Sequence, residues 1–84
     1  MYKIRLSNKV VKYLELLPKK DFLKIDTAIL SLKINPRPIG IKKLVDIDGY
    51  RIRVGNYRIL FTIDDDIKIV SIYKVAPRKD AYRY

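Results

Sequence analysis

The sequence predicts an α+β domain with the element order β-α-α-β-β-β, and three observations lead to this fold class. Apolar residues recur at helical spacing between residues 8 and 34, but they alternate with polar ones between residues 49 and 75. Pro36 and Pro38 separate these two halves. Two turn signals, Gly55-Asn56 and Asp64–Asp66, divide the second half into three strands. We expect one domain over residues 1–84, with an antiparallel helical hairpin packed on one face of a twisted sheet.

The N-terminal segment is expected to form a strand and then a helix. Residues 2–6 alternate between apolar and basic side chains, which is typical of a half-buried strand. Ser7 can cap the following helix, because a serine hydroxyl accepts a backbone N–H at a helix start. The helix carries apolar residues at helical spacing: Val10, Val11, Leu14 and Leu17. Pro18 either ends this helix or opens the next one.

A second helix is predicted from Lys19 to about Ile34. One apolar stripe faces the core and consists of Phe22, Ile25, Ile29 and Leu32. The short joint between the helices predicts an antiparallel hairpin. Its outward positions are mostly lysines: Lys9, Lys12, Lys19, Lys20, Lys24 and Lys33.

Three antiparallel strands are expected at about 49–54, 57–63 and 67–75. A two-residue loop at Gly55-Asn56 pairs Val54 with Tyr57 and Arg53 with Arg58. Because side chains alternate across a strand, one face carries Arg51, Arg53, Arg58 and Leu60. The register of the second hairpin stays open: a loop of two or four residues places Tyr73 opposite Arg58, whereas a three-residue loop places Ile72 there.

The composition narrows the possible functions. The chain has 19 Lys and Arg, 9 Asp and Glu, no His and no Cys, and a formal charge of +10. This excludes a cysteine–histidine zinc site, a disulfide framework, a thiol nucleophile and a histidine base. The apolar runs are too short to span a membrane and no signal peptide is visible, so we expect a cytoplasmic protein without a cofactor. A folded chain this basic is expected to bind a polyanion or an acidic partner.

The arginines of the first hairpin form a candidate anion site. Arg53 and Arg58 face each other directly, which is unfavourable for like charges unless an anion lies between them. A phosphate suits guanidinium geometry. Asp46 or Asp48 could neutralise the arginines instead, whereas the acidic turn lies too far along its hairpin.

The C-terminal segment adds cations and aromatic rings. Arg78, Lys79, Tyr82 and Tyr84 follow the last strand and can fold over the arginines. Tyrosines among cations suit nucleobases, which stack on aromatic rings. Packing of the two tyrosines on the sheet edge is the alternative.

The chain resembles the RelE family of toxins, within the wider RelE/ParE superfamily of type II toxin–antitoxin systems. The resemblance covers nearly all of the chain, and its specific part is residues 49–61, GYRIRVGNYRILF, followed by residues 77–82, PRKDAY. It implies an mRNA interferase, an endoribonuclease that cuts messenger RNA in the ribosomal A site and inhibits translation. In that family the 2′-hydroxyl attacks the adjacent phosphate, leaving a 2′,3′-cyclic or 3′-phosphate and a 5′-hydroxyl.

The resemblance also implies roles for individual residues. Arg51 and Arg53 fall near the nucleophile and phosphate, Arg58 stabilises the phosphate, and Arg78 acts at the leaving oxygen. Tyr82 stacks on the base. The further RNA-binding candidates are basic or aromatic: Lys42, Lys43, Lys74, Lys79, Arg83 and Tyr84.

The sequence departs from the family pattern in two places. Some members carry Lys where Arg51 and Arg53 stand, and Pro77 stands where His or another polar residue is common. Arginine stays protonated, so the chemistry would rest on stabilising charge and orienting the substrate. Lys42, Lys43 and Lys74 are the remaining candidate bases, and each needs a strongly lowered pKa.

Two other functions compete with RNA cleavage. A ParE-like member poisons DNA gyrase through protein contacts, and a non-catalytic module would bind nucleic acid without cutting it. The resemblance implies an acidic antitoxin, encoded by a neighbouring gene, as the protein partner. An acidic partner would meet this basic surface quickly.

Overall fold

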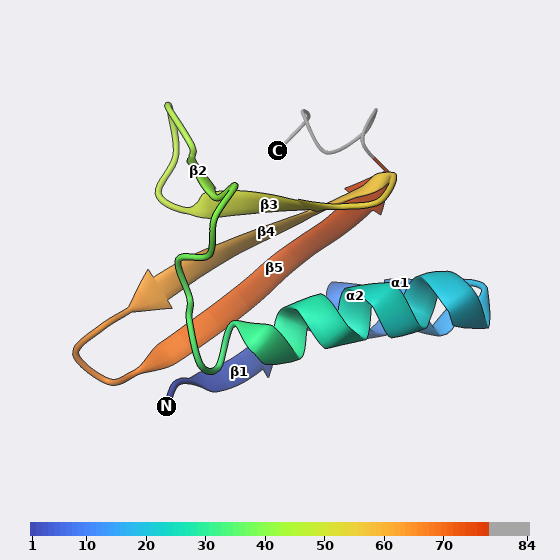
Figure 1. The fold of residues 1–84 in the computed structure, drawn as a ribbon, viewed down its shortest axis with the longest axis horizontal. Coiled ribbons are helices and arrows are strands. Elements are labelled where there is room, and N and C mark those ends of the chain that lie inside the picture. Colours follow the sequence, from blue (N-terminus) through green and yellow to red (C-terminus); the bar gives the residue numbers. More distant parts are fainter. Residues whose placement is uncertain (78–84) are drawn as a thin grey trace.

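The computed structural model describes residues 1–77 and contains two helices and a five-stranded mixed sheet (Figure 1). The helices are α1 (Asn8–Glu15) and α2 (Lys19–Ser31). The strands are β1 (Lys3–Leu6), β2 (Lys42–Lys43), β3 (Tyr50–Val54), β4 (Tyr57–Asp64) and β5 (Ile69–Pro77). The predicted fold class is confirmed. The sheet order is β1-β5-β4-β3-β2, with β1 parallel to β5 and the other neighbours antiparallel.

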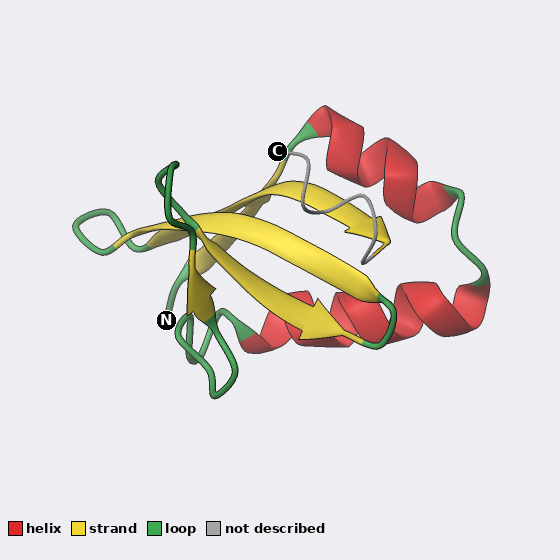
Figure 2. Ribbon diagram, turned by 90° about the horizontal axis from the view of Figure 1, so that it is seen from above, coloured by secondary structure: helices red, strands yellow, loops and turns green. Residues whose placement is uncertain are grey.

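The two helices begin and end close to the positions that the sequence indicates. Ser7 caps α1, because its Oγ accepts the backbone N–H of Val10 at 3.2 Å. Pro18 stands at the start of α2, where its missing N–H costs nothing. The helix ends at Ser31, earlier than predicted, and the chain continues as a turn. The helices run in opposite directions on the same side of the sheet (Figure 2).

The main core lies between the helices and the sheet. The apolar stripe of α2 is buried there, with Ile25 and Leu32 fully covered. The sheet contributes side chains that alternate along each strand, which is why they reach the same face: Ile52, Ile59, Phe61, Val70, Ile72 and Val75. Within residues 1–77, no helix has the length and apolarity needed to cross a membrane.

The register of the second hairpin differs from both predicted alternatives. Arg58 pairs with Ala76, not with Tyr73 or Ile72. The loop is Asp65–Lys68, because Asp64 Oδ1 accepts the N–H groups of Asp66 at 3.0 Å and Ile67 at 3.2 Å. Lys68 closes the loop in the left-handed region, with φ 58°. The turn therefore lies further along the chain than the three aspartates indicate.

A β-bulge at Tyr73 changes which side chains of β5 face the helices. Phe61 pairs with Ile72, but the next residue of β4, Leu60, pairs with Lys74 rather than Tyr73. If the strand had no bulge and Tyr73 paired with Leu60, Lys74 would face the core and Val75 would face away, since a one-residue shift exchanges the two faces. The bulge instead places Val75 in the core and Lys74 on the opposite face.

Candidate phosphate-binding face of the sheet

On the face of the sheet opposite the helices, strands β2 to β5 gather five basic residues. Arg53 lies directly opposite Arg58, as predicted. A second row crosses four strands, because β2 pairs with β3, β3 with β4 and β4 with β5. Paired residues of an antiparallel ladder share a face. We call the resulting surface the arginine face and define it by Lys42, Arg51, Arg53, Arg58 and Lys74.

The three arginines lie at different depths in this face. Arg53 is exposed, Arg51 is half-buried, and Arg58 is 0% exposed. Arg58 is the one charged residue that is buried within residues 1–77. A cation at low local dielectric attracts an anion more strongly than an exposed one does. The arrangement therefore combines a buried positive charge at Arg58 with an exposed one at Arg53.

Three buried apolar side chains lie on the same face as the arginines. Leu60 and Ala76 are buried, and they pair with Arg51 and Arg58 respectively. Leu44 is also buried, next to the β2–β3 connection. None of these three belongs to the main core cluster of the described residues. The arginine face thus has a thin apolar layer of its own.

Gly49 holds the β2–β3 connection close to this layer. Its φ is +139°, and a Cβ there would lie 3.0 Å from the carbonyl oxygen of Phe61 and 3.2 Å from the Tyr73 hydroxyl. The Gly49 carbonyl accepts the N–H of Leu44 at 3.0 Å. Glycine is needed because any side chain would be strained and would push against β4.

The opposite end of β4 carries the negative charge. Asp65 accepts two hydrogen bonds from the guanidinium of Arg37, at 2.9 and 3.1 Å, and one from the Tyr2 hydroxyl at 2.6 Å. The Arg37 bonds, then the Tyr2 bond, lower the pKa of Asp65 to about 2. Asp48 lines a surface depression with Asp64–Asp66 at this same end. Arg58 lies six residues from Asp64 along β4, so the acidic turn and the facing arginines occupy opposite ends of the hairpin.

The turn between β3 and β4 is tied to α2. The Tyr57 hydroxyl donates to Asp21 Oδ2 at 2.8 Å, and this bond is the main cause of a raised pKa at Tyr57. Gly55 allows the turn with φ +58°. These contacts fix the hairpin end at which Arg53 and Arg58 face each other.

The predicted site residues fall into three groups. Lys42, Lys74 and the three sheet arginines lie together on the arginine face. Lys43 pairs with Tyr50, which packs on the main core, so Lys43 belongs to the other face. The remaining predicted residues lie outside the described part of the chain: Arg78, Lys79, Tyr82, Arg83 and Tyr84. Within that described part, no cluster of three or more His, Cys, Asp or Glu side chains is arranged to hold a metal ion.

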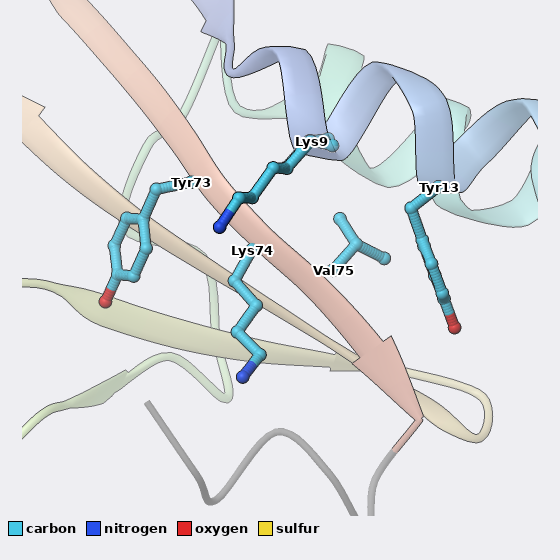
Figure 3. Close-up of a pocket in the computed structure, with 6 residues that line it drawn as sticks. Lys9, Tyr13, Tyr73, Lys74 and Val75 are labelled. Atoms are coloured by element: carbon cyan, nitrogen blue, oxygen red, sulfur yellow. The ribbon is translucent and has the colours of Figure 1, made fainter.

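A groove that the sequence did not reveal borders the arginine face (Figure 3). It has a volume of about 430 Å³ and is lined by residues of α1 and β5: Lys9, Val10, Tyr13, Tyr73, Lys74 and Val75. Lys9 stands out in the sequence only as one of many helix lysines. Its spacing of four residues from Tyr13 is the one signal that the sequence offers, since such pairs share a helix face.

Comparisons with known proteins place this geometry in a family. Residues 4–82 match the family model described as ParE toxin of type II toxin-antitoxin system, parDE. The curated protein "Putative toxin RelE1" of Methanocaldococcus jannaschii is 33% identical over 86 residues, which cover 98% of this chain and 96% of that protein.

Two solved structures are similar over most of their length. One is a chain of the archaeal RelE–RelB complex from Pyrococcus horikoshii OT3, with 27% identity, a TM-score of 0.79, and coverage of 92% of this chain and 94% of that one. The other is a chain of the toxin–antitoxin complex RelBE2 from Mycobacterium tuberculosis, with 26% identity, a TM-score of 0.81, and coverage of 92% and 98%.

Proposed function

Because this chain belongs to the RelE/ParE family of toxins of type II toxin–antitoxin systems, we propose that it is a ribosome-dependent endoribonuclease that cuts messenger RNA. One observation carries the proposal: Arg53 and Arg58 face each other directly, with Arg51 on the same strand face. Such a constellation suits the extra negative charge that develops on a phosphate during cleavage.

The RNA, the protein and water account for every bond and proton of the proposed reaction. The 2′-oxygen forms a bond to phosphorus and loses its proton to water, while the bond from phosphorus to the 5′-oxygen breaks. The 5′-oxygen takes up a proton, leaving a 2′,3′-cyclic phosphate and a 5′-hydroxyl. Arg58 and Arg53 stabilise the pentacovalent phosphate, and Arg51 orients the strand. By family resemblance, Arg78 assists the leaving oxygen and Tyr82 stacks on a base.

The first test separates the arginine face from the rest of the basic surface. Arg58→Ala and Arg78→Ala are expected to abolish growth arrest on expression, while circular dichroism shows a folded protein. Losing one donor to transition-state charge typically lowers the rate ~10²–10³-fold. Lys12→Ala, which removes an exposed charge from α1, serves as the matched control and should stay toxic. The proposal is wrong if both arginine variants remain toxic and still cleave cellular mRNA in primer extension.

Poisoning of DNA gyrase is the second candidate function, and the matching family model favours it by its description as a ParE toxin. Gyrase poisoning would act through protein contacts and would not require the facing arginines. A supercoiling assay with purified toxin distinguishes the two functions: inhibition of gyrase without mRNA cleavage would support this candidate. Salt-dependent RNA binding with neither activity would indicate a non-catalytic module.

An antitoxin partner is part of the proposal. The similar chains from Pyrococcus horikoshii and Mycobacterium tuberculosis were solved within toxin–antitoxin complexes. The +10 charge of this chain predicts an acidic partner, encoded beside it, which wraps the basic surface and blocks access to RNA. Co-expression should yield a heterocomplex and relieve toxicity.

A further inference from the structure

The groove in Figure 3 lies between α1 and the C-terminal half of β5. β1 ends at Leu6, opposite Ile72, so within residues 1–77 no strand pairs with the outer edge of β5 beyond that point. Helix α1 packs there instead and forms the second wall of the groove. Tyr73, at the β-bulge, and its neighbour Lys74 form the wall of the groove on the side of the sheet. The β-bulge that determines the direction of Lys74 therefore also shapes this groove.

The lining combines an apolar floor with rings and positive charges. Val10 and Val75 are buried at the bottom, at 1% and 5% exposure. Lys9 and Tyr13 stand one helical turn apart and project toward β5. Tyr13 is seen edge-on in Figure 3, so one face of its ring is turned toward Val75 and Lys74. A planar base with an attached phosphate matches this combination, because the ring offers a stacking surface and the lysines offer charge.

The groove is continuous with the arginine face through Lys74. Lys74 lies in the row of Arg51 and Leu60, and it also lines the groove. Two strand spacings, roughly 10 Å, separate the backbones of Arg51 and Lys74. A nucleic-acid strand that places one phosphate among the arginines therefore reaches the groove with a neighbouring nucleotide.

We propose that the α1–β5 groove binds the nucleotide next to the cleaved phosphate, with its base against Tyr13 and its backbone phosphate between Lys9 and Lys74. This subsite rests on the proposed function, since it assumes that RNA lies on the arginine face. An acidic peptide of an antitoxin would satisfy the lysines but would leave the ring without a planar partner. The chemistry of the whole lining therefore favours a nucleotide.

The experiment uses the full chain and a short single-stranded RNA whose 2′-oxygens are methylated, so that it binds without being cut. Fluorescence anisotropy reports its affinity. Tyr13→Ala is expected to weaken binding roughly 5- to 150-fold, the loss typical of one stacked base, whereas Tyr13→Phe keeps the ring and should bind nearly as wild type. Lys9→Gln should lower the salt-dependence slope by about 0.7, the value for one phosphate of a single strand. Lys12→Gln, on the same helix but outside the groove, should leave the slope unchanged.

A second arm shows whether the base itself is recognised. RNAs carrying one abasic nucleotide at successive positions are compared between wild type and Tyr13→Ala. At one position, next to the cleavage site, the abasic RNA should bind wild type and Tyr13→Ala equally. Without the base, the ring of Tyr13 has nothing to stack on, so its removal should cause no further loss of affinity. Thermal unfolding shows whether Tyr13→Ala is folded, and Lys9→Gln tests the groove independently.

The outcomes separate this inference from the proposed function. If the wild type cleaves mRNA but the Tyr13 and Lys9 variants bind and cleave as it does, the groove is not a subsite and the proposed function stands. If those variants lose only affinity for the antitoxin, the groove is a protein-binding site and the inference is overturned. If the wild type cleaves no RNA on ribosomes yet stacks a base at Tyr13, the groove binds nucleotides and the proposed nuclease function fails.

Discussion

The two faces of the central sheet are built from the same strands but have opposite character. The face under the helices is continuous and apolar, and its members Ile59, Phe61 and Val70 are fully buried. The arginine face has only a thin apolar layer, and the like charges Arg53 and Arg58 stand opposite each other on it. Like charges placed directly opposite lower stability, so this face is not arranged for stability alone. The comparison indicates that one face of the sheet stabilises the fold and that the other face carries the proposed chemistry.

Val75→Lys should have the largest effect, because the bulge at Tyr73 places residue 75 on the face under the helices. A charge there would be buried without compensation, which costs about 3–5 kcal/mol, comparable to the roughly 4–12 kcal/mol expected for a domain of this size. Urea denaturation should show a largely unfolded protein. Lys74→Val changes the neighbouring residue on the arginine face and should stay folded; equal stability of Val75→Lys and wild type would refute the placement of residue 75 in the core.

Phe61→Ala tests the helix-covered face alone. Phe61 is 0% exposed in the main core, and truncating such a ring typically costs ~3–5 kcal/mol. The chemical denaturation midpoint should fall strongly. Ile67→Ala is the control, since this side chain is 62% exposed and its loss should change stability by at most ~0.5 kcal/mol. A similar small change for Phe61→Ala would show that the core is placed incorrectly.

Gly49→Ala tests the layer beneath the arginine face. A Cβ at Gly49 meets Phe61 and Tyr73 in a conformation that side chains rarely adopt, so the expected loss is ~1–3 kcal/mol. Gly40→Ala is matched, because Gly40 also has a positive φ, +92°, but nothing lies within 4 Å of its added Cβ. Thermal unfolding should rank Gly49→Ala as the more damaging change, and the reverse order would contradict the close approach at Gly49.

The smallest expected effect is a pH dependence at the acidic end of the sheet. The folded-state pKa of Asp65 is about 2, below its ordinary value of 3.8, so its stabilising contribution is complete above pH 4. The contribution is lost as the pH falls through about 2. Asp65→Asn should therefore remove part of the decline in stability between pH 4 and pH 2. Parallel stability curves for wild type and variant would show that the Arg37 contact contributes nothing.

The amino-acid sequence predicts the first hairpin residue by residue, but it does not predict the register of the second. Gly55-Asn56 is a strong turn signal, so the amino-acid sequence alone predicts the Arg53–Arg58 pairing. The second loop closes at Lys68, whose positive φ is not expected from a lysine. The bulge at Tyr73 also has no sequence signature. Two-residue β2 is too short to show a period, although its Lys42 joins the arginine face.

The groove of the candidate site could not be predicted from the sequence either. Tyr13 belongs to α1 and Tyr73 to β5, and only the packing of helix on sheet brings them to one groove. The roles of the arginines and of residues 78–84 stay predictions.

The most direct test of the central claim uses purified toxin, programmed ribosomes and two messenger RNAs. One is entirely ribose, and the other carries a single 2′-deoxynucleotide on the 5′ side of the cleaved bond. We predict cleavage of the first, with a cyclic or 3′-phosphate and a 5′-hydroxyl, and no cleavage of the second at that bond. Equal cleavage of both RNAs, or no cleavage of either while DNA gyrase is inhibited, would contradict it.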